Sequence, residues 1–306
     1  MSLQKKGFQP INLLFGALMG TADIIPGVSG GTVALIVGIY ERLIASVRGV
    51  ASGIVRIARG HATEGRGLLR EVEWGLVIPL GIGIVTALVV GARVLEPILE
   101  AYPIQSRALF FGLIAASVAV PWDRIGSRAP VHFWVTGLAT VAAFVLVGLP
   151  PREIVDPALP VVFAAASIAI CAMILPGVSG SFLLLVMGLY ETTIGALNAL
   201  DLAYVGVFIL GAALGLGVFS KLLYYLLSRH HDVTMAALVG LMLGSLRALW
   251  PYQDETRRLL APPSTESFLQ VLVVAAIGFA LVVVLIRVGR AIEEKDQARD
   301  EARAAN

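Results

Sequence analysis

A Pro-Gly pair interrupts an apolar segment at two corresponding places in the chain, and this repetition limits the folds that the chain can adopt. The first copy reads Ile-Ile-Pro-Gly-Val-Ser-Gly-Gly-Thr over residues 24–32, and the second reads Ile-Leu-Pro-Gly-Val-Ser-Gly-Ser over residues 174–181, at an offset of 150 residues. Each copy continues to a Gly-x-Tyr-Glu sequence, at residues 38–41 and 188–191. Paired breaks of this kind in two halves of a membrane protein indicate a transport site where the halves meet.

The composition assigns the chain to the membrane proteins. Of its 306 residues 58% are hydrophobic and 14% are charged, and the mean hydropathy is +0.86, which is too apolar for a soluble domain of this size. The formal net charge is only +2, and Lys and Arg at helix ends set topology, so no nucleic-acid partner is indicated. Cys171 is the single cysteine and excludes an intrachain disulfide.

We predict an all-α polytopic membrane protein with ten apolar segments, five in each half. The segments of the first half cover residues 11–25, 29–47, 74–99, 107–120 and 132–149, and those of the second half cover 158–175, 179–197, 203–227, 234–250 and 268–288. The two segments beside each Pro-Gly are shorter than the roughly 20 residues that a spanning helix needs. Each pair is therefore predicted to form a re-entrant helical hairpin, over 11–47 and 158–197, followed by three transmembrane helices.

An odd number of crossings in each half makes the second half an inverted-topology repeat of the first. The predicted repeats cover residues 1–150 and 151–291, and a charged tail covers 292–306. If all five segments crossed, the same inversion would follow. Basic residues are concentrated in alternate loops, which by the positive-inside rule places both termini in the cytoplasm.

The hairpin tips are the predicted anion site. Backbone polar groups at a broken helix need partners at membrane depth, so such breaks line a cavity or contact a ligand. The half-helix after each break directs backbone N–H groups toward the centre, where a phosphate fits. Pro26 and Pro176 are the predicted hinges, and the predicted substrate-binding residues of the tips are Gly27, Ser29, Gly30, Gly31, Thr32, Gly177, Ser179, Gly180 and Ser181. The alternative is that the glycines only allow tight helix packing and the hydroxyls only cap helices.

Charged residues inside apolar segments are further candidates, because burying them in a membrane is costly. Arg93 and Lys221 occupy equivalent third segments and are predicted phosphate contacts, with snorkelling to the headgroups as the alternative. Asp23, Glu41 and Glu191 are predicted to act in coupling or gating. Asp23 has no acidic counterpart, since Met173 takes its place in the second copy.

The sequence contains no motif that indicates an enzyme. No nucleotide-binding loop or nucleophile elbow is present. The four histidines lie at segment ends or in loops without a metal-ligand spacing. We therefore expect no catalytic residue, no metal and no cofactor.

The repeated Pro-Gly-Val-Ser-Gly and the Gly-x-Tyr-Glu that follows resemble the polyprenyl-phosphate transporters of the PopT type, a family once known only as a domain of unknown function. The resemblance extends over nearly the whole chain, and it implies a protein of the cytoplasmic membrane of a bacterial or archaeal cell. It implies a flippase that returns undecaprenyl phosphate, the carrier lipid of cell-wall and surface-glycan synthesis, from the outer to the cytoplasmic leaflet. Alternating access of a central phosphate site is the mechanism that we expect, with a proton or sodium gradient as a candidate source of direction.

Two alternatives remain open. Undecaprenyl pyrophosphate phosphatases also have inverted repeats with re-entrant hairpins, but Gly30 and Gly180 occupy the position of the arginine in their Pro-Gly-x-Ser-Arg-Ser motif. A small-anion transporter would use the same hairpin tips, because a helix N-terminus binds any compact anion. Prenyl length and oligomeric state leave no mark in the sequence.

Overall fold

The computed structural model describes residues 10–24, 28–151, 153–254 and 256–304, and these residues fold into helices and loops without a strand. The side chains of residues 92, 93, 95, 96 and 288–304 are not described. The helices of the first half are α1 (Ile11–Ile24), α2 (Gly30–Ile36), α3 (Tyr40–Ala58), α4 (Ala62–Glu71), α5 (Trp74–Ala101), α6 (Pro103–Ser117), α7 (Ala119–Asp123) and α8 (Pro130–Val147). Those of the second half are α9 (Leu159–Ile174), α10 (Gly180–Val186), α11 (Tyr190–Asn198), α12 (Leu202–Arg229), α13 (His231–Ser245), the 3-10 helix η1 (Leu246–Leu249) and α14 (Thr265–Ala304).

The second arm of each predicted hairpin is divided into two helices, which the sequence did not indicate. Gly38 and Gly188 have φ angles of +78° and +79°, in the left-handed region that glycine enters without a steric penalty. Each glycine ends a seven-residue half-helix, α2 or α10. In the second half, α10 and α11 are bent by 107° relative to each other, so the predicted segments 29–47 and 179–197 are not continuous helices.

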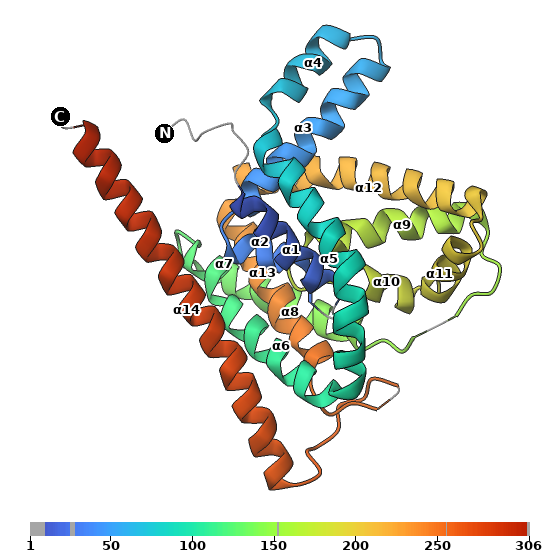
Figure 1. Cartoon of the computed structure of the whole chain (residues 1–306), viewed down its shortest axis with the longest axis vertical. Coiled ribbons are helices and arrows are strands. Elements are labelled where there is room, and N and C mark those ends of the chain that lie inside the picture. Colours follow the sequence, from blue (N-terminus) through green and yellow to red (C-terminus); the bar gives the residue numbers. More distant parts are fainter. Residues whose placement is uncertain (1–9, 25–27, 152, 255, 305–306) are drawn as a thin grey trace.

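The helix contacts follow the same pattern in both halves. Helix α1 packs against α5 in the first half, as α9 packs against α12 in the second. The remaining long helices pair across the halves, because α8 packs against α13 while α14 packs against α6 (Figure 1). Each half therefore contributes one long helix to the other, which ties the two halves into one body.

Glycines allow these helices to approach closely. A Cβ at Gly16 of α1 would lie 2.1 Å from the Leu80 carbonyl oxygen of α5. The matching contact in the second half is at Gly215 of α12, where a Cβ would lie 2.4 Å from the Ser167 carbonyl oxygen of α9. Small residues at helix interfaces are typical of membrane proteins, in which close van der Waals contact holds helices together.

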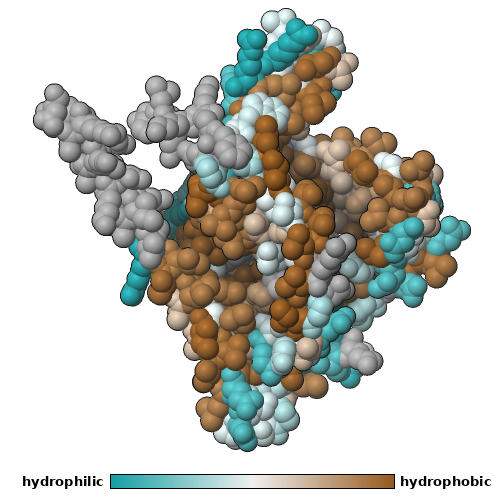
Figure 2. All heavy atoms as spheres, in the orientation of Figure 1, coloured by the Kyte–Doolittle hydropathy of each residue, from teal (hydrophilic) through white to brown (hydrophobic). Residues whose placement is uncertain are grey.

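Among the described residues, six helices are long and apolar enough to cross a membrane, or up to seven if the bent α10–α11 pair is one span. Hydrophobic residues cover most of the face shown in Figure 2, and hydrophilic residues gather at the tip of the α3–α4 pair and at the opposite end. The described chain is thus a polytopic helical membrane protein. Helices α3 and α4 project from the body at the end to which the C-terminal part of α14 also runs (Figure 1).

The charged tail is the continuation of α14, not a separate element. This helix runs from Thr265 to Ala304, past the predicted boundary at residue 291. The predicted segments left residues 48–73 without a helix, whereas α3 continues to Ala58 and α4 follows it.

Candidate functional site

The tip of the first hairpin is hydrogen bonded to the second hairpin. Ser29 caps the N-terminus of α2 and accepts a hydrogen bond from the Gly31 amide at 3.1 Å. Its hydroxyl oxygen also lies 3.1 Å from the Met173 carbonyl oxygen and 3.2 Å from that of Leu175. The hydroxyl carries one proton, which can be donated to one of these carbonyls at a time. Ser29 is completely buried, so its side chain joins the two halves inside the protein.

Two more hydrogen bonds connect the tips. The Gly177 amide donates to Thr32 Oγ1 at 3.1 Å, and the Tyr40 hydroxyl donates to the Ile174 carbonyl at 3.2 Å. Gly177 has a φ angle of +84°, and a Cβ there would lie 2.8 Å from the Met242 Cα, so both conformation and space require glycine. We call the contact between residues 28–40 and residues 173–181 the tip junction.

An acidic side chain occupies the N-terminal end of α2. The Gly30 amide donates to Asp23 Oδ1 at 2.7 Å, and a Cβ at Gly30 would lie 2.8 Å from Asp23 Oδ2. We expected the first amides of α2 to be open to a ligand, and this expectation is wrong for Gly30 and Gly31. A carboxylate and a hydroxyl of the protein itself satisfy these two amides, as carboxylates and caps do at many helix N-termini.

The tip of the second hairpin has a different arrangement. The hydroxyls of Ser179 and Ser181 are 2.8 Å apart, and the Phe182 amide donates to Ser179 Oγ at 3.4 Å. Met173 replaces the acidic residue, and a Cβ at Gly180 would lie 2.4 Å from its Cγ. The two tips therefore share the capping serine but not the carboxylate.

Glu41 belongs to a charged cluster on the α3–α4 side of the tip junction. Its Oε1 lies 3.6 Å from Arg124 Nη1 and 3.6 Å from His231 Nε2. Arg124 also donates from Nη2 to the Leu35 carbonyl in the last turn of α2, at 3.4 Å. A cation at that end complements the helix dipole. Consequently α2 has a carboxylate at its N-terminal end and a guanidinium at its C-terminal end.

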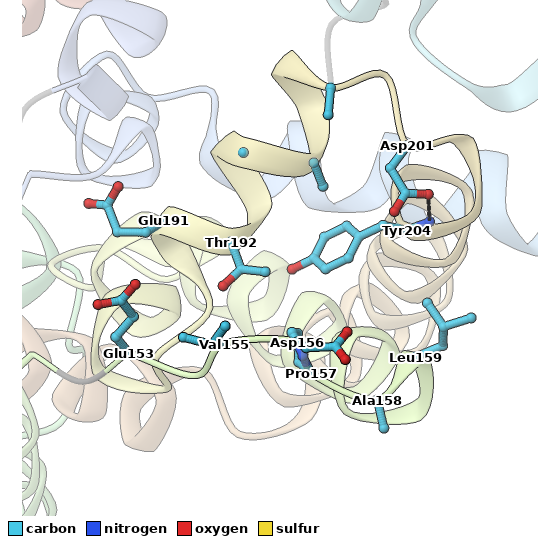
Figure 3. Close-up of a pocket in the computed structure, with 13 residues that line it drawn as sticks. Glu153, Val155, Asp156, Pro157, Ala158, Leu159, Glu191, Thr192, Asp201 and Tyr204 are labelled. Atoms are coloured by element: carbon cyan, nitrogen blue, oxygen red, sulfur yellow. Dashed lines mark hydrogen bonds between the residues drawn. The ribbon is translucent and has the colours of Figure 1, made fainter.

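Glu191 lies elsewhere, at a pocket of about 650 Å³ between α11 and the loop before α9. Glu153, Asp156 and Asp201 also line this pocket. Their carboxylates point in different directions in Figure 3, and that of Asp201 accepts hydrogen bonds from the first amides of α12. Within the described residues, no three His, Cys, Asp or Glu side chains are placed to hold a metal ion. The negative charge around this pocket opposes phosphate binding.

The remaining predicted residues are placed as follows. Lys221 is exposed on α12 and has no ion pair or hydrogen bond with any described residue, so its predicted phosphate contact stays a prediction. The side chain of Arg93, on α5, is not described. Pro26 and Gly27 lie outside the described residues, whereas Pro176 is buried in the turn before α10.

Sequence reasoning missed two side chains that contact the tip junction or α2. Tyr40 is 1% exposed. It is the tyrosine of the first Gly-x-Tyr-Glu sequence, so the repetition of that sequence could have identified it. Only its glutamate was considered. Arg124 had no such signal, because its partners lie 89 and 83 residues earlier, at positions 35 and 41.

Comparison with known proteins gives consistent results. Residues 19–267 match the family described as undecaprenyl phosphate translocase-like. A polyprenyl-phosphate transporter from Vibrio cholerae is 36% identical over 241 residues, covering 79% of this chain and 77% of the relative. One from Staphylococcus aureus is 31% identical over 312 aligned positions, covering 94% and 99%. No solved structure matches this chain significantly.

Proposed function

The chain belongs to the undecaprenyl phosphate translocase-like family, and from this premise we propose that it moves polyprenyl phosphate between the two leaflets of a membrane. The observation that carries the proposal is the tip junction, where the Ser29 hydroxyl of one broken segment contacts carbonyls of the other. Broken helices that meet within a membrane protein are typical of sites for polar substrates. The lipid phosphate is such a substrate, since its headgroup cannot cross hydrocarbon unaided.

The phosphate headgroup would bind at the tip junction while the prenyl tail stays in the lipid. The hydroxyls of Ser29, Thr32, Ser179 and Ser181 are available as donors once the hydrogen bonds across the junction open, and the Gly177 amide, which is bonded to Thr32 in this structure, is freed with them. Ser29 is completely buried and the two tips are hydrogen bonded to each other, and we infer a closed state of this site.

Alternating access follows from an inverted relation between the two halves. The exchange of long helices, α8 onto α13 and α14 onto α6, is the contact pattern expected for two repeats related by an axis in the membrane plane. Movement of the α1–α5 pair or the α9–α12 pair against the core of α6, α8, α13 and α14 would open the junction to one side of the membrane and then to the other. We also propose that the two broken segments form re-entrant hairpins and that both termini are cytoplasmic.

The proposed direction is from the outer to the cytoplasmic leaflet, which would return the carrier lipid to cell-envelope glycan synthesis. Asp23 is the strongest candidate for coupling, because its carboxylate contacts the tip directly. Glu41 can act in gating, because it binds Arg124 near the end of α2. Glu191 has no contact with the tip junction and becomes the weakest of the three candidates.

A small-anion transporter is the second candidate function, and the polar groups of the tip junction would serve it equally well. The decisive experiment is reconstitution of the pure protein into liposomes that contain a fluorescent polyprenyl phosphate. An impermeant quencher reports leaflet exposure, and released phosphate is assayed in parallel. Lipid movement without phosphate release supports the proposal. Phosphate release from the pyrophosphate form would identify a phosphatase, and transport of inorganic phosphate alone would favour the second candidate.

A further inference from the structure

Helices α3 and α4 form an antiparallel pair that leaves the body of the protein (Figure 1). A Cβ at Gly53 would lie 3.0 Å from the Gly65 carbonyl oxygen, and one at Gly65 would lie 2.6 Å from the Gly53 carbonyl oxygen. These two glycines therefore mark the line along which the helices touch. On one side of this line, Arg56 Nη1 lies 2.7 Å from Glu64 Oε2, so the ion pair identifies one face of the pair.

The other face combines apolar and basic side chains. Successive residues of an α-helix are about 100° apart, so the residues before and after a contact glycine are turned to opposite faces, and in an antiparallel pair these faces coincide for the two helices. Glu64 precedes Gly65 and lies on the face of the ion pair. Ile54 and Arg66 follow the contact glycines and lie on the opposite face. Residues four positions further share that face, which we call the α3–α4 patch: Ile54, Ala58, Arg66 and Arg70.

The α3–α4 patch is turned toward the bilayer. Helix α12 is apolar and long enough to span a membrane, and a Cβ at its Gly217 would lie 3.2 Å from the Ala51 Cβ of α3. Ile54 follows Ala51 by three residues and lies on the same side of α3. Helix α4 leads into another candidate span, α5, whose first residue Trp74 donates from its indole nitrogen to the Leu69 carbonyl at 2.8 Å. Because tryptophan is typical of the membrane interface, the pair leaves the body at the membrane surface.

The side chains of the α3–α4 patch suit an anionic lipid surface. Ile54 is 57% exposed, and contact with acyl chains would remove this apolar area from water. Residues 48–71 contain five arginines and two glutamates, a net charge of +3, and one of the glutamates is bound on the other face. Hydrophobic residues gather along the α3 side of the pair in Figure 2, and hydrophilic residues along the α4 side and the tip. Basic and apolar groups arranged in this way bind anionic lipids at the interface.

We propose that the α3–α4 pair docks on the membrane surface beside the protein, where Ile54 and Ala58 contact acyl chains while Arg66 and Arg70 bind the phosphates of anionic phospholipids. This interaction goes beyond the proposed function and does not depend on the transported substrate. Helix α3 begins at Tyr40, whose hydroxyl is bonded across the tip junction. Docking on lipid therefore anchors one end of the first hairpin to the bilayer.

The test attaches a fluorophore to each face of the pair in the full-length protein, reconstituted in nanodiscs of phosphatidylcholine and phosphatidylglycerol. Ile54→Cys places the probe on the α3–α4 patch. Ser52→Cys is the matched control, because it precedes a contact glycine and lies on the opposite face, and both variants carry Cys171→Ser. Nitroxide groups on the lipid acyl chains quench a probe that enters the membrane. The probe at position 54 should lose most of its fluorescence, and the probe at position 52 should lose little.

The role of charge is tested in the Ile54→Cys protein. Arg66→Gln combined with Arg70→Gln should lower the ratio of docked to free pair about fivefold for each arginine, the loss expected for one basic residue at an anionic surface. Nanodiscs of phosphatidylcholine alone should also reduce the quenching. The control combines Arg56→Gln with Arg59→Gln, which removes two charges from the other face and should change the ratio less than twofold. Thermal unfolding of each variant should show that the fold is kept.

Three results would overturn the proposal. Equal quenching at positions 52 and 54 would show that the α3–α4 patch does not face the lipid. Equal losses for the two pairs of arginine variants would reveal only a general charge effect. Disulfide-linked dimers formed through Ile54→Cys, without quenching by the lipid, would identify the patch as an interface between two copies of the chain.

Discussion

The two hairpin tips have almost the same sequence, yet the structure gives them different partners. At the first tip, Asp23 binds the Gly30 amide and Arg124 binds the end of α2, so charges of the protein itself occupy both ends of this half-helix. At the second tip, Met173 replaces the acidic residue and Arg257 lies over Phe182. The comparison teaches that the same motif can be neutralised in two ways: the first tip has charged partners at both ends of its half-helix, whereas the second has a guanidinium over an aromatic ring.

The largest expected effect comes from filling the tip junction. A Cβ at Gly31 would lie 2.5 Å from the Ile174 carbonyl oxygen, a backbone atom that cannot move aside alone. Gly31→Val should destabilise the protein by about 3 kcal/mol, as overpacking does, and should abolish lipid movement. The matched control is Gly30→Ala, whose nearest contact is the flexible Asp23 side chain. Thermal unfolding in detergent compares the two, and equal melting temperatures would contradict the close contact between the tips.

Removing the hydroxyl of Ser29 should have the next largest effect. Ser29→Ala removes a helix cap and the contact with two carbonyls of the second hairpin, at a cost of about 2 kcal/mol. Ser179→Ala removes a helix cap and a hydrogen bond with Ser181, both within its own hairpin, at a cost of about 1 kcal/mol. Replacement of either serine by Leu should block transport while membrane insertion is retained. Denaturant titration measures the difference, and a larger loss for Ser179→Ala would reverse the assigned roles.

Asp23→Asn tests whether the carboxylate couples transport to an ion gradient. The amide oxygen of Asn can still accept the hydrogen bond from Gly30, so we expect a loss of stability of only about 1 kcal/mol. Lipid movement should lose its dependence on a proton or sodium gradient, whereas Glu191→Gln should keep it. The measurement is the initial rate of lipid movement in liposomes with and without an imposed proton or sodium gradient. Gradient dependence that survives in Asp23→Asn would remove Asp23 from the coupling path.

The smallest effect is expected at the glutamates of the repeated Gly-x-Tyr-Glu. Glu41 contacts Arg124 and His231 at 3.6 Å, but its side chain is 49% exposed, so Glu41→Gln should cost about 0.5 kcal/mol. Glu191→Gln should leave stability unchanged. Rising salt should reduce the difference between these variants, because solvent ions screen an exposed pair. A salt-independent difference would show that Glu41 acts through a buried contact.

The sequence predicted the helical class, the repeated breaks and the residues of the tips, because these features are recorded locally in hydropathy and in Pro-Gly pairs. It did not predict that Gly38 and Gly188 divide the second arms, since single glycines are common in membrane helices. Nor did it predict that Asp23 satisfies the Gly30 amide or that Arg257 reaches Phe182. These contacts depend on how separate segments pack, and no sequence pattern pairs positions 182 and 257, which are 75 positions apart.

The claim that transport requires the tip junction to open is tested most directly by a reversible lock. Ser29→Cys and Leu175→Cys, introduced together with Cys171→Ser, put one thiol on each side of the junction, at two residues that are in contact because the Ser29 hydroxyl lies 3.2 Å from the backbone carbonyl oxygen of Leu175. Each single cysteine in the same background is the control. Oxidation that forms the disulfide should stop polyprenyl phosphate movement in liposomes, and reduction should restore it. Transport at an undiminished rate through the locked protein would contradict the account.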